Sequence, residues 1–141
     1  MYRRNIRNYK PYLSPPLSLL TLAAHTPEEI GIELIDENTE PVPFDHDYDL
    51  VGITAMSQQA WRAYAIAAEF RKRGIPVVMG GIHASVMPEE ALQHVDTVFI
   101  GEAENTWPQF LNDLAQGTPR QIYKGEALSD LHHAKTPRYD L

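Results

Sequence analysis

Residues 49–83, DLVGITAMSQQAWRAYAIAAEFRKRGIPVVMGGIH, place two short apolar runs on either side of a helical pattern. Asp49–Thr54 is short and β-branched, and Ile75–Gly81 stops at paired glycines, so each predicts a buried strand. Ser57–Arg73 has the apolar spacing of a helix, and Gly74 follows a basic last turn that suits the helix dipole. A strand, a helix and a second strand in this order predict a βαβ unit with parallel strands.

The same alternation of strand and helix continues on both sides of this unit. Further strands are predicted at Ile30–Glu37 and Thr97–Gly101, with a short edge strand within Thr118–Gly125. Further helices are predicted at Pro15–Thr26, Met87–His94 and Glu104–Gln116. In the central helix, one face is traced by Trp61, Tyr64, Ala68 (or Ala67) and Phe70 or Arg71. Continuous apolar runs suit a sheet covered on both faces, so the predicted fold class is α/β: a Rossmann- or flavodoxin-like, doubly wound, mainly parallel sheet.

The start of the chain departs from this pattern. Met1–Tyr12 is too polar for a central strand, so either a poor edge-like strand stands there or the first strand is missing. A missing strand would leave an open slot in the sheet, which makes a homodimer conceivable. Residues 1–125 are therefore predicted to form the α/β domain, and residues 126–141, which lack a clear period, a linker or arm.

Composition excludes several classes of function. The 141 residues contain 12 basic and 19 acidic side chains, a net charge of −7, which argues against nucleic-acid binding. There is no cysteine, so this chain alone holds no disulfide, thiolate metal site or iron–sulfur cluster. No apolar run is long enough for a bilayer and no secretory signal is evident, so no membrane partner is expected and the cytoplasm is the expected location.

Candidate binding residues are predicted where the strands end, because open parallel sheets bind ligands beyond the carboxyl ends of their strands. After the strand that ends at Thr54 come Thr54, Ala55, Met56, Ser57 and Gln58; after the next, Gly80, Gly81, Ile82 and His83; after the third, Gly101, Glu102 and Glu104. Asp36–Asn38 follows the strand predicted before these. In the predicted fold, these loops lie at one edge of the sheet.

Each of these residue types has both a structural and a binding interpretation. Paired glycines let a ligand approach the backbone closely or simply allow a turn. His83 could bind a ligand or metal, or hydrogen-bond a neighbouring loop. Thr54 and Ser57 could grip a polar ligand, although Ser57 also suits a helix N-cap. Glu102 and Glu104 at a helix start are explained by the helix dipole alone.

Recognisable catalytic motifs are absent from the sequence. It contains no G-x-G-x-x-G, no G-x-x-x-x-G-K-[ST] and no G-x-S-x-G. The pair His132-His133 has no third ligand at metal-site spacing. A complete catalytic constellation is therefore not identified.

Taken together, four segments resemble the N-terminal cobalamin-binding-type domain of radical-SAM enzymes: PPLSLLTLAAHTPEE, ELIDENTEPV, DLVGITAMSQQAWRAYAIAAEFRKRGIPVVMGGIHASVMPEEAL and VDTVFIGEAENTWPQFLNDL. The resemblance runs from about Pro15 to Gly125, and Ser18 stands where family members have glycine. It implies that cobalamin lies across the strand-end loops, with its nucleotide tail descending between strands. Thr54 to Ser57 and Gly80-Gly81 would then be loop and tail contacts, and His83 and Gly101 to Glu104 would line the same rim.

The resemblance also implies what else the complete enzyme contains. A C-terminal radical-SAM barrel would be the partner and would hold a 4Fe–4S cluster and S-adenosylmethionine, which a chain without cysteine cannot do alone. D-x-H-x-x-G, which supplies an axial histidine in related domains, is absent. The resemblance implies that bound cobalamin would be base-off without an axial histidine from that motif. The chain is expected to position cobalamin or substrate and not to be catalytic alone. The alternatives are a cofactor-free structural or substrate-docking domain and, with less support, a flavodoxin-like signalling or nucleotide-binding domain.

Overall fold

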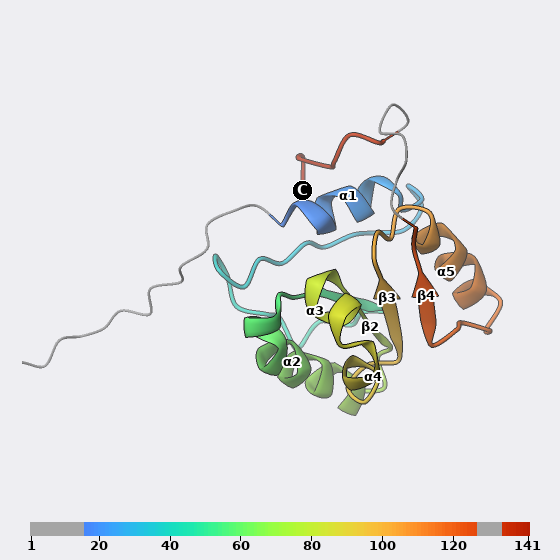
Figure 1. Ribbon diagram of the computed structural model, residues 1–141. Coiled ribbons are helices and arrows are strands. Elements are labelled where there is room, and N and C mark those ends of the chain that lie inside the picture. Colours follow the sequence, from blue (N-terminus) through green and yellow to red (C-terminus); the bar gives the residue numbers. More distant parts are fainter. Residues whose placement is uncertain (1–15, 127–133) are drawn as a thin grey trace, which may run out of the picture.

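A computed structural model describes residues 16–126 and 134–141, and its centre is a four-stranded sheet (Figure 1). The strands are β1 (Val51–Thr54), β2 (Val77–Gly80), β3 (Thr97–Ile100) and β4 (Ile122–Lys124). They pair in the order β1-β2-β3-β4, and every pair is parallel. This confirms the predicted parallel sheet, including the edge strand within Thr118–Gly125.

Helices cover both faces of the sheet, as a doubly wound fold requires. They are α1 (Leu17–Ala24), the 3-10 turn η1 (Ser57–Gln59), α2 (Ala60–Lys72), α3 (Gly81–Val86), α4 (Pro88–Ala91) and α5 (Thr106–Ala115). Residues of α2, α3 and α4 share one core with Val77, Met79 and Val98. Residues of α1 and α5 pack on the opposite face, against Val78 and Phe99 (Figure 1).

The face under α2, α3 and α4 is closed. Val77, Met79 and Val98 alternate along their strands toward this face and are fully buried. Phe70 of α2 fills the space above them and is 2 % exposed. The ring of Phe44, from the connection before β1, lies 5.2 Å from the ring of Phe70 and seals its outer side. Trp61 is 74 % exposed, so the prediction that it shares one face of the helix with Phe70 is wrong.

Ile30–Glu37 does not form a strand, which corrects the sequence prediction. Its apolar alternation suits a strand, but a strand also needs a neighbour to pair its N–H and C=O groups. None of the four described strands pairs with this segment. It ends in a turn at Asp36, whose carboxylate Oδ1 accepts the N–H of Asn38 at 2.8 Å.

Two helices also differ from their predicted extents. The sequence predicts a loop at Gly80 to His83, yet α3 begins directly at Gly81. Met87–His94 was expected to be one helix, yet α4 covers only Pro88–Ala91. The chain therefore folds back onto β3 by two short helices and not by an open loop and one longer helix.

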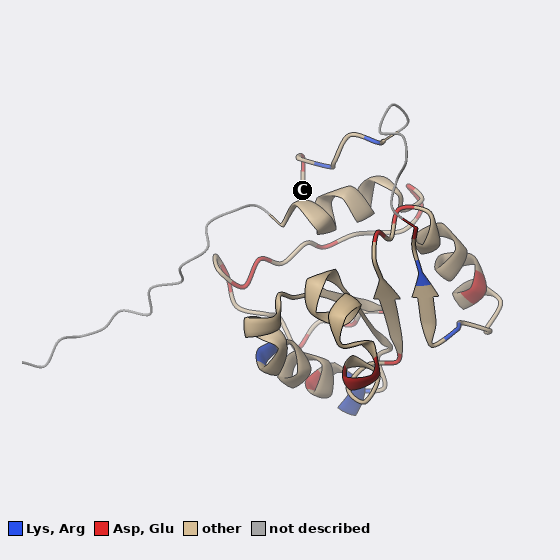
Figure 2. Ribbon diagram, viewed as in Figure 1, with Lys and Arg blue, Asp and Glu red and all other residues tan. Residues whose placement is uncertain are grey.

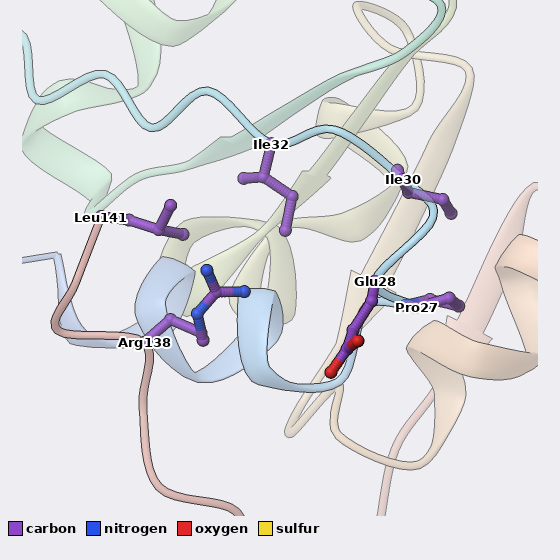
Figure 3. A pocket seen from close by; sticks show the side chains of 6 residues that line it. All are labelled: Pro27, Glu28, Ile30, Ile32, Arg138 and Leu141. Atoms are coloured by element: carbon purple, nitrogen blue, oxygen red, sulfur yellow. The ribbon is translucent and has the colours of Figure 1, made fainter.

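The end of the described chain returns to α1. The N–H of Arg138 donates to the carbonyl of Leu20 at 3.0 Å, which holds residues 134–141 against that helix. A hollow of about 380 Å³ lies between this tail and the segment after α1, and Figure 3 shows the side chains that line it: Pro27, Glu28, Ile30, Ile32, Arg138 and Leu141.

The prediction for Met1–Tyr12 lies outside the described residues, and the boundary at residue 125 stays a prediction.

Candidate functional site

A second cavity, of about 380 Å³, lies between α1 and the sheet, and its floor follows from strand alternation. Gly52 and Thr54 of β1 lie beside Val78 and Gly80 of β2 in the parallel register. These four positions face α1, and two of them have no side chain. A Cβ at Gly52 would lie 3.8 Å from Val78 Cγ2, so the floor there is bare backbone with room above it.

The roof of the cavity is α1. Its sequence, LSLLTLAA, has no charged residue, and Figure 2 shows the helix free of acidic and basic colour. Leu20 and Ala23 are buried. The hydroxyl of Ser18 lies 3.4 Å from that of Thr54, which places a small polar spot in a mainly apolar space. Beyond the end of the helix, the indole N–H of Trp107 donates to Thr26 Oγ1 at 2.9 Å and ties this region to α5.

The rim of the cavity consists of close backbone contacts after β2 and β3. Gly81 has φ +90°, and a Cβ on it would lie 2.6 Å from Thr54 Oγ1. Beside the rim, the position that a Cβ on Gly125 would take is occupied by the carbonyl oxygen of the lining residue Glu102. Glycine is needed at both positions because any side chain would displace its neighbour.

The structure brings half of the predicted site residues to this cavity. Those that line it are Thr54, Gly80, Gly81, Gly101, Glu102 and Glu104. Those that do not are Ala55, Met56, Ser57, Gln58, Ile82 and His83. Helix α3 explains two of these exceptions: Ile82 is 58 % exposed, and His83 is buried against other helices.

His83 belongs to a polar cluster between α2, α3 and α4, so the expectation that it lines the same rim is wrong. Its Nε2 lies 2.6 Å from the Tyr64 hydroxyl and 3.7 Å from Glu90 Oε1. Burial and the hydrogen bond to Glu90 raise the pKa of Tyr64 to about 12. Tyr64 therefore stays a neutral hydroxyl at physiological pH, and His83 serves to join three helices on the closed face.

Ser57 does not cap the helix that it precedes, which corrects a second expectation. The preceding N–H, that of Met56, is instead satisfied by the side-chain carbonyl of Gln59 at 3.0 Å. Asp36–Asn38 also lies outside the cavity. Glu37 forms a hydrogen-bonded ion pair with Arg62 of α2, with its Oε1 2.8 Å from Arg62 Nε.

The sequence interpretation missed two of the four floor positions and the whole roof. The missed lining residues are Leu17, Ser18, Leu19, Thr21, Leu22, Gly52, Ile53, Val78, Phe99 and Trp107. One signal was present: Gly52 interrupts an otherwise β-branched strand, and a strand glycine often marks close approach by another group. The roof could not be found in the same way, because nothing in α1 itself indicates which strands it covers.

The lining determines what kind of ligand the cavity suits. Its surface is mainly aliphatic and aromatic, its hydroxyls come from serine and threonine, and its carboxylates stand at the rim. No histidine lines it, and residues 16–126 and 134–141 contain no cluster of three metal-ligating side chains. A volume of about 380 Å³ is at the small end of ligand pockets. The cavity therefore suits an apolar group with few polar contacts, or one part of a larger ligand.

Comparison with known proteins identifies the family. The sequence profile of the B12 binding domain matches residues 11–111. This chain belongs to the B12 binding domain family. The match includes α1, β1, β2 and β3, and thus all of the residues that line the cavity. The expected resemblance to cobalamin-binding-type domains is thereby confirmed.

Several methyltransferases have similar sequences. The chain is 46% identical to bacteriochlorophyllide d C-8(2)-methyltransferase of Chlorobaculum tepidum over 82% of this chain and 26% of that protein. It is 30% identical to the C-12(1)-methyltransferase of the same organism, over 90% of this chain and 28% of that protein. Hopanoid C-2 methylase of Rhodopseudomonas palustris is 26% identical over 90% of this chain and 25% of that protein. The chain thus spans about a quarter of the length of these relatives.

A solved structure supports the fold. The N-terminal domain of a hypothetical protein of Thermotoga maritima superimposes with a TM-score of 0.53 at 23% identity. The superposition covers 89% of this chain and 100% of that one.

Within the described residues, no helix has the length and apolar character needed to cross a membrane.

Proposed function

We propose that this domain binds cobalamin and inserts part of the cofactor into the cavity beneath α1. The observation that carries the proposal is the glycine-floored cavity at the carboxyl ends of β1 and β2, within the segment that matches the B12 binding domain. Cobalamin is far larger than about 380 Å³, so the cavity would take one arm of the molecule while the remainder lies across the rim.

The residues present fit such a ligand. Gly52, Val78 and Phe99 would contact an apolar, flat group, and the hydroxyls of Ser18 and Thr54 would hydrogen-bond its polar edge. The glycine turns at the rim let the backbone approach the ligand closely. When bound, cobalamin supplies a cobalt centre for one-carbon or radical chemistry. His83 is turned to the other face of the sheet, so it would not be among the residues that hold the cofactor beneath α1.

We further propose that the domain serves a larger radical-SAM methyltransferase. Support comes from the names of the relatives and from their greater length. The partner would be a C-terminal radical-SAM barrel holding a 4Fe–4S cluster and S-adenosylmethionine, since this chain has no cysteine to ligate a cluster. The isolated chain would bind and position but not catalyse, and the complete protein would act in the cytoplasm.

Filling the floor of the cavity tests the proposal. Gly52→Val adds a side chain where the Cβ has ordinary contacts, and valine suits a strand, so the variant should fold. The matched control is Gly31→Val, since a Cβ at Gly31 has nothing within 4 Å and this position lies outside the cavity. Hydroxocobalamin is titrated against each protein by visible difference spectra, and retention is measured after desalting.

Wild type and Gly31→Val should bind equally, and Gly52→Val should bind at least about tenfold more weakly, a loss of about 1.4 kcal/mol. If Gly52→Val binds as tightly as wild type, the ligand does not occupy this cavity. No retention by wild type would support the alternative, a cofactor-free structural or substrate-docking domain.

A further inference from the structure

One hydroxyl group links the two glycine turns of the cavity rim. Ser85 Oγ donates to the carbonyl of Gly81 at 2.9 Å and accepts the N–H of Gly101, also at 2.9 Å. Gly81 follows β2 and Gly101 follows β3, so this hydroxyl bridges turns from neighbouring strands. Both glycines line the cavity, whereas Ser85 does not.

The geometry of α3 makes this bridge possible. Ser85 lies four residues after Gly81, one turn along the helix, so its hydroxyl reaches back to the carbonyl of the first helical residue. The second half of the bridge is not local, because Gly101 is 16 residues away in sequence. The bond to Gly101 does not stabilise α3 itself. It fixes the distance between two turns whose glycines each have a left-handed conformation, Gly81 with φ +90° and Gly101 with φ +75°.

We propose that Ser85 is a positioning residue that sets the shape of the cavity rim and thereby the affinity for the ligand. It acts through Gly81 and Gly101 and does not touch the ligand itself. The inference rests on the proposed function, cobalamin binding beneath α1. A merely structural serine would affect stability but not the affinity of the folded protein.

Three variants of the 141-residue chain separate these roles. Ser85→Ala removes both bonds, and Ser85→Thr keeps the hydroxyl. Thr97→Val is the matched control: Thr97 Oγ1 donates to the carbonyl of Arg120 at 2.9 Å, and Thr97 begins β3, at the opposite end of the strand from Gly101. It therefore removes a comparable side-chain-to-backbone bond without touching the rim.

Hydroxocobalamin affinity is the first measurement. It is made under conditions in which urea titration shows that every variant is folded. Ser85→Ala should raise the Kd about fivefold, the factor typical of one net hydrogen bond. Ser85→Thr should stay within about twofold of wild type, as should Thr97→Val even though it is less stable. A wild-type Kd for Ser85→Ala, or an equal loss in Thr97→Val, would overturn the proposal.

Amide exchange provides a second measurement that does not depend on cobalamin. The Gly101 N–H should exchange faster in Ser85→Ala than in wild type and at the wild-type rate in Thr97→Val. If wild type binds no hydroxocobalamin, the proposed function fails while this measurement still tests the bridge. Unchanged Gly101 exchange in Ser85→Ala would overturn the bridge itself.

Discussion

The two faces of the sheet are built from the same four strands, yet one is a filled core and the other is partly hollow. Toward α2, α3 and α4 the central strands present Val77, Met79 and Val98, all fully buried. Toward α1 the same part of the sheet presents Gly52, Thr54 and Gly80. The difference lies in alternate residues of single strands, since Met79 and Gly80 are neighbours.

This contrast shows how a small domain can have both stability and space for a ligand. Aromatic rings fill the face under α5, where Phe99 packs against Phe110 with ring centroids 5.4 Å apart. Among the described residues, the part of this face under α1 is left open. Stability should therefore depend mainly on the closed face and on α5, and binding mainly on the region of α1. The predictions below test that separation.

The largest expected effect is on the closed face. Phe70→Ala removes a ring that is 2 % exposed and should lower the free energy of unfolding by about 3–5 kcal/mol. Leu22→Ala, its counterpart on α1, truncates a partly buried side chain beside existing space and should cost only about 1–2 kcal/mol. Urea unfolding of both variants measures the difference, and equal losses would contradict the separation of the two faces.

A smaller effect is expected from the polar cluster on the closed face. Tyr64→Phe removes the hydroxyl 2.6 Å from His83 Nε2 and leaves that buried nitrogen without its closest partner, at a cost of about 1–3 kcal/mol. Tyr48→Phe is the control, because it removes a hydroxyl bonded to Glu33 at an exposed site and should cost no more than about 1 kcal/mol. The two losses are compared by urea unfolding. A cost for Tyr64→Phe no greater than for Tyr48→Phe would show that the cluster does not hold the three helices together.

The smallest expected effect is a pH dependence on the α1 side. Burial, and then the charge of Lys135, lower the pKa of His25 below its ordinary 6.5, while Glu104 opposes the shift. The unfolded chain therefore takes up the proton more readily, so the stability that His25 contributes is present above pH 6.5 and is lost as the pH falls through 6.5 toward the folded value.

Unfolding free energies at pH 7.5 and 5.5 for wild type and His25→Gln measure this contribution. The pH dependence should be weaker in the variant. The carboxylates with lowered pKa, Glu33, Asp113 and Asp140, lose their contribution only below their ordinary values of 4.5, 3.8 and 3.8. An identical pH dependence in both proteins would show that His25 does not contribute.

Local sequence pattern was sufficient for much of the fold and for part of the site. The βαβ unit around Ser57–Arg73 was predictable because strand pairing and the crossing helix leave period and glycine signals in one segment. Ile30–Glu37 was not, because its conformation depends on a neighbouring strand and not on its own alternation. Trp61 was assigned to the wrong helix face because a sequence rich in alanine leaves the buried face ambiguous.

The candidate site also consists of residues that local sequence predicts and residues that depend on long-range contacts. The rim glycines Gly81 and Gly101 were predictable from their place after strands. The roof was not, because the contact of α1 with β1 and β2 is a long-range feature. In the sequence, His83 follows the same predicted strand as Gly80 and Gly81, so it was assigned to the same binding edge. Because α3 begins directly at Gly81, the His83 side chain instead lies on the opposite face of the sheet.

The contact between Gly125 and Glu102 has a consequence for how substitutions will be tolerated. Gly125 lies outside both cores and does not line the cavity, so by burial or binding alone it would be an unremarkable position. The space for its Cβ is nevertheless taken by the Glu102 carbonyl oxygen. In a survey of all single substitutions, position 125 should be as restricted as a core residue. Its restriction would record the packing of one backbone segment against another, which neither hydrophobicity nor ligand contact reveals.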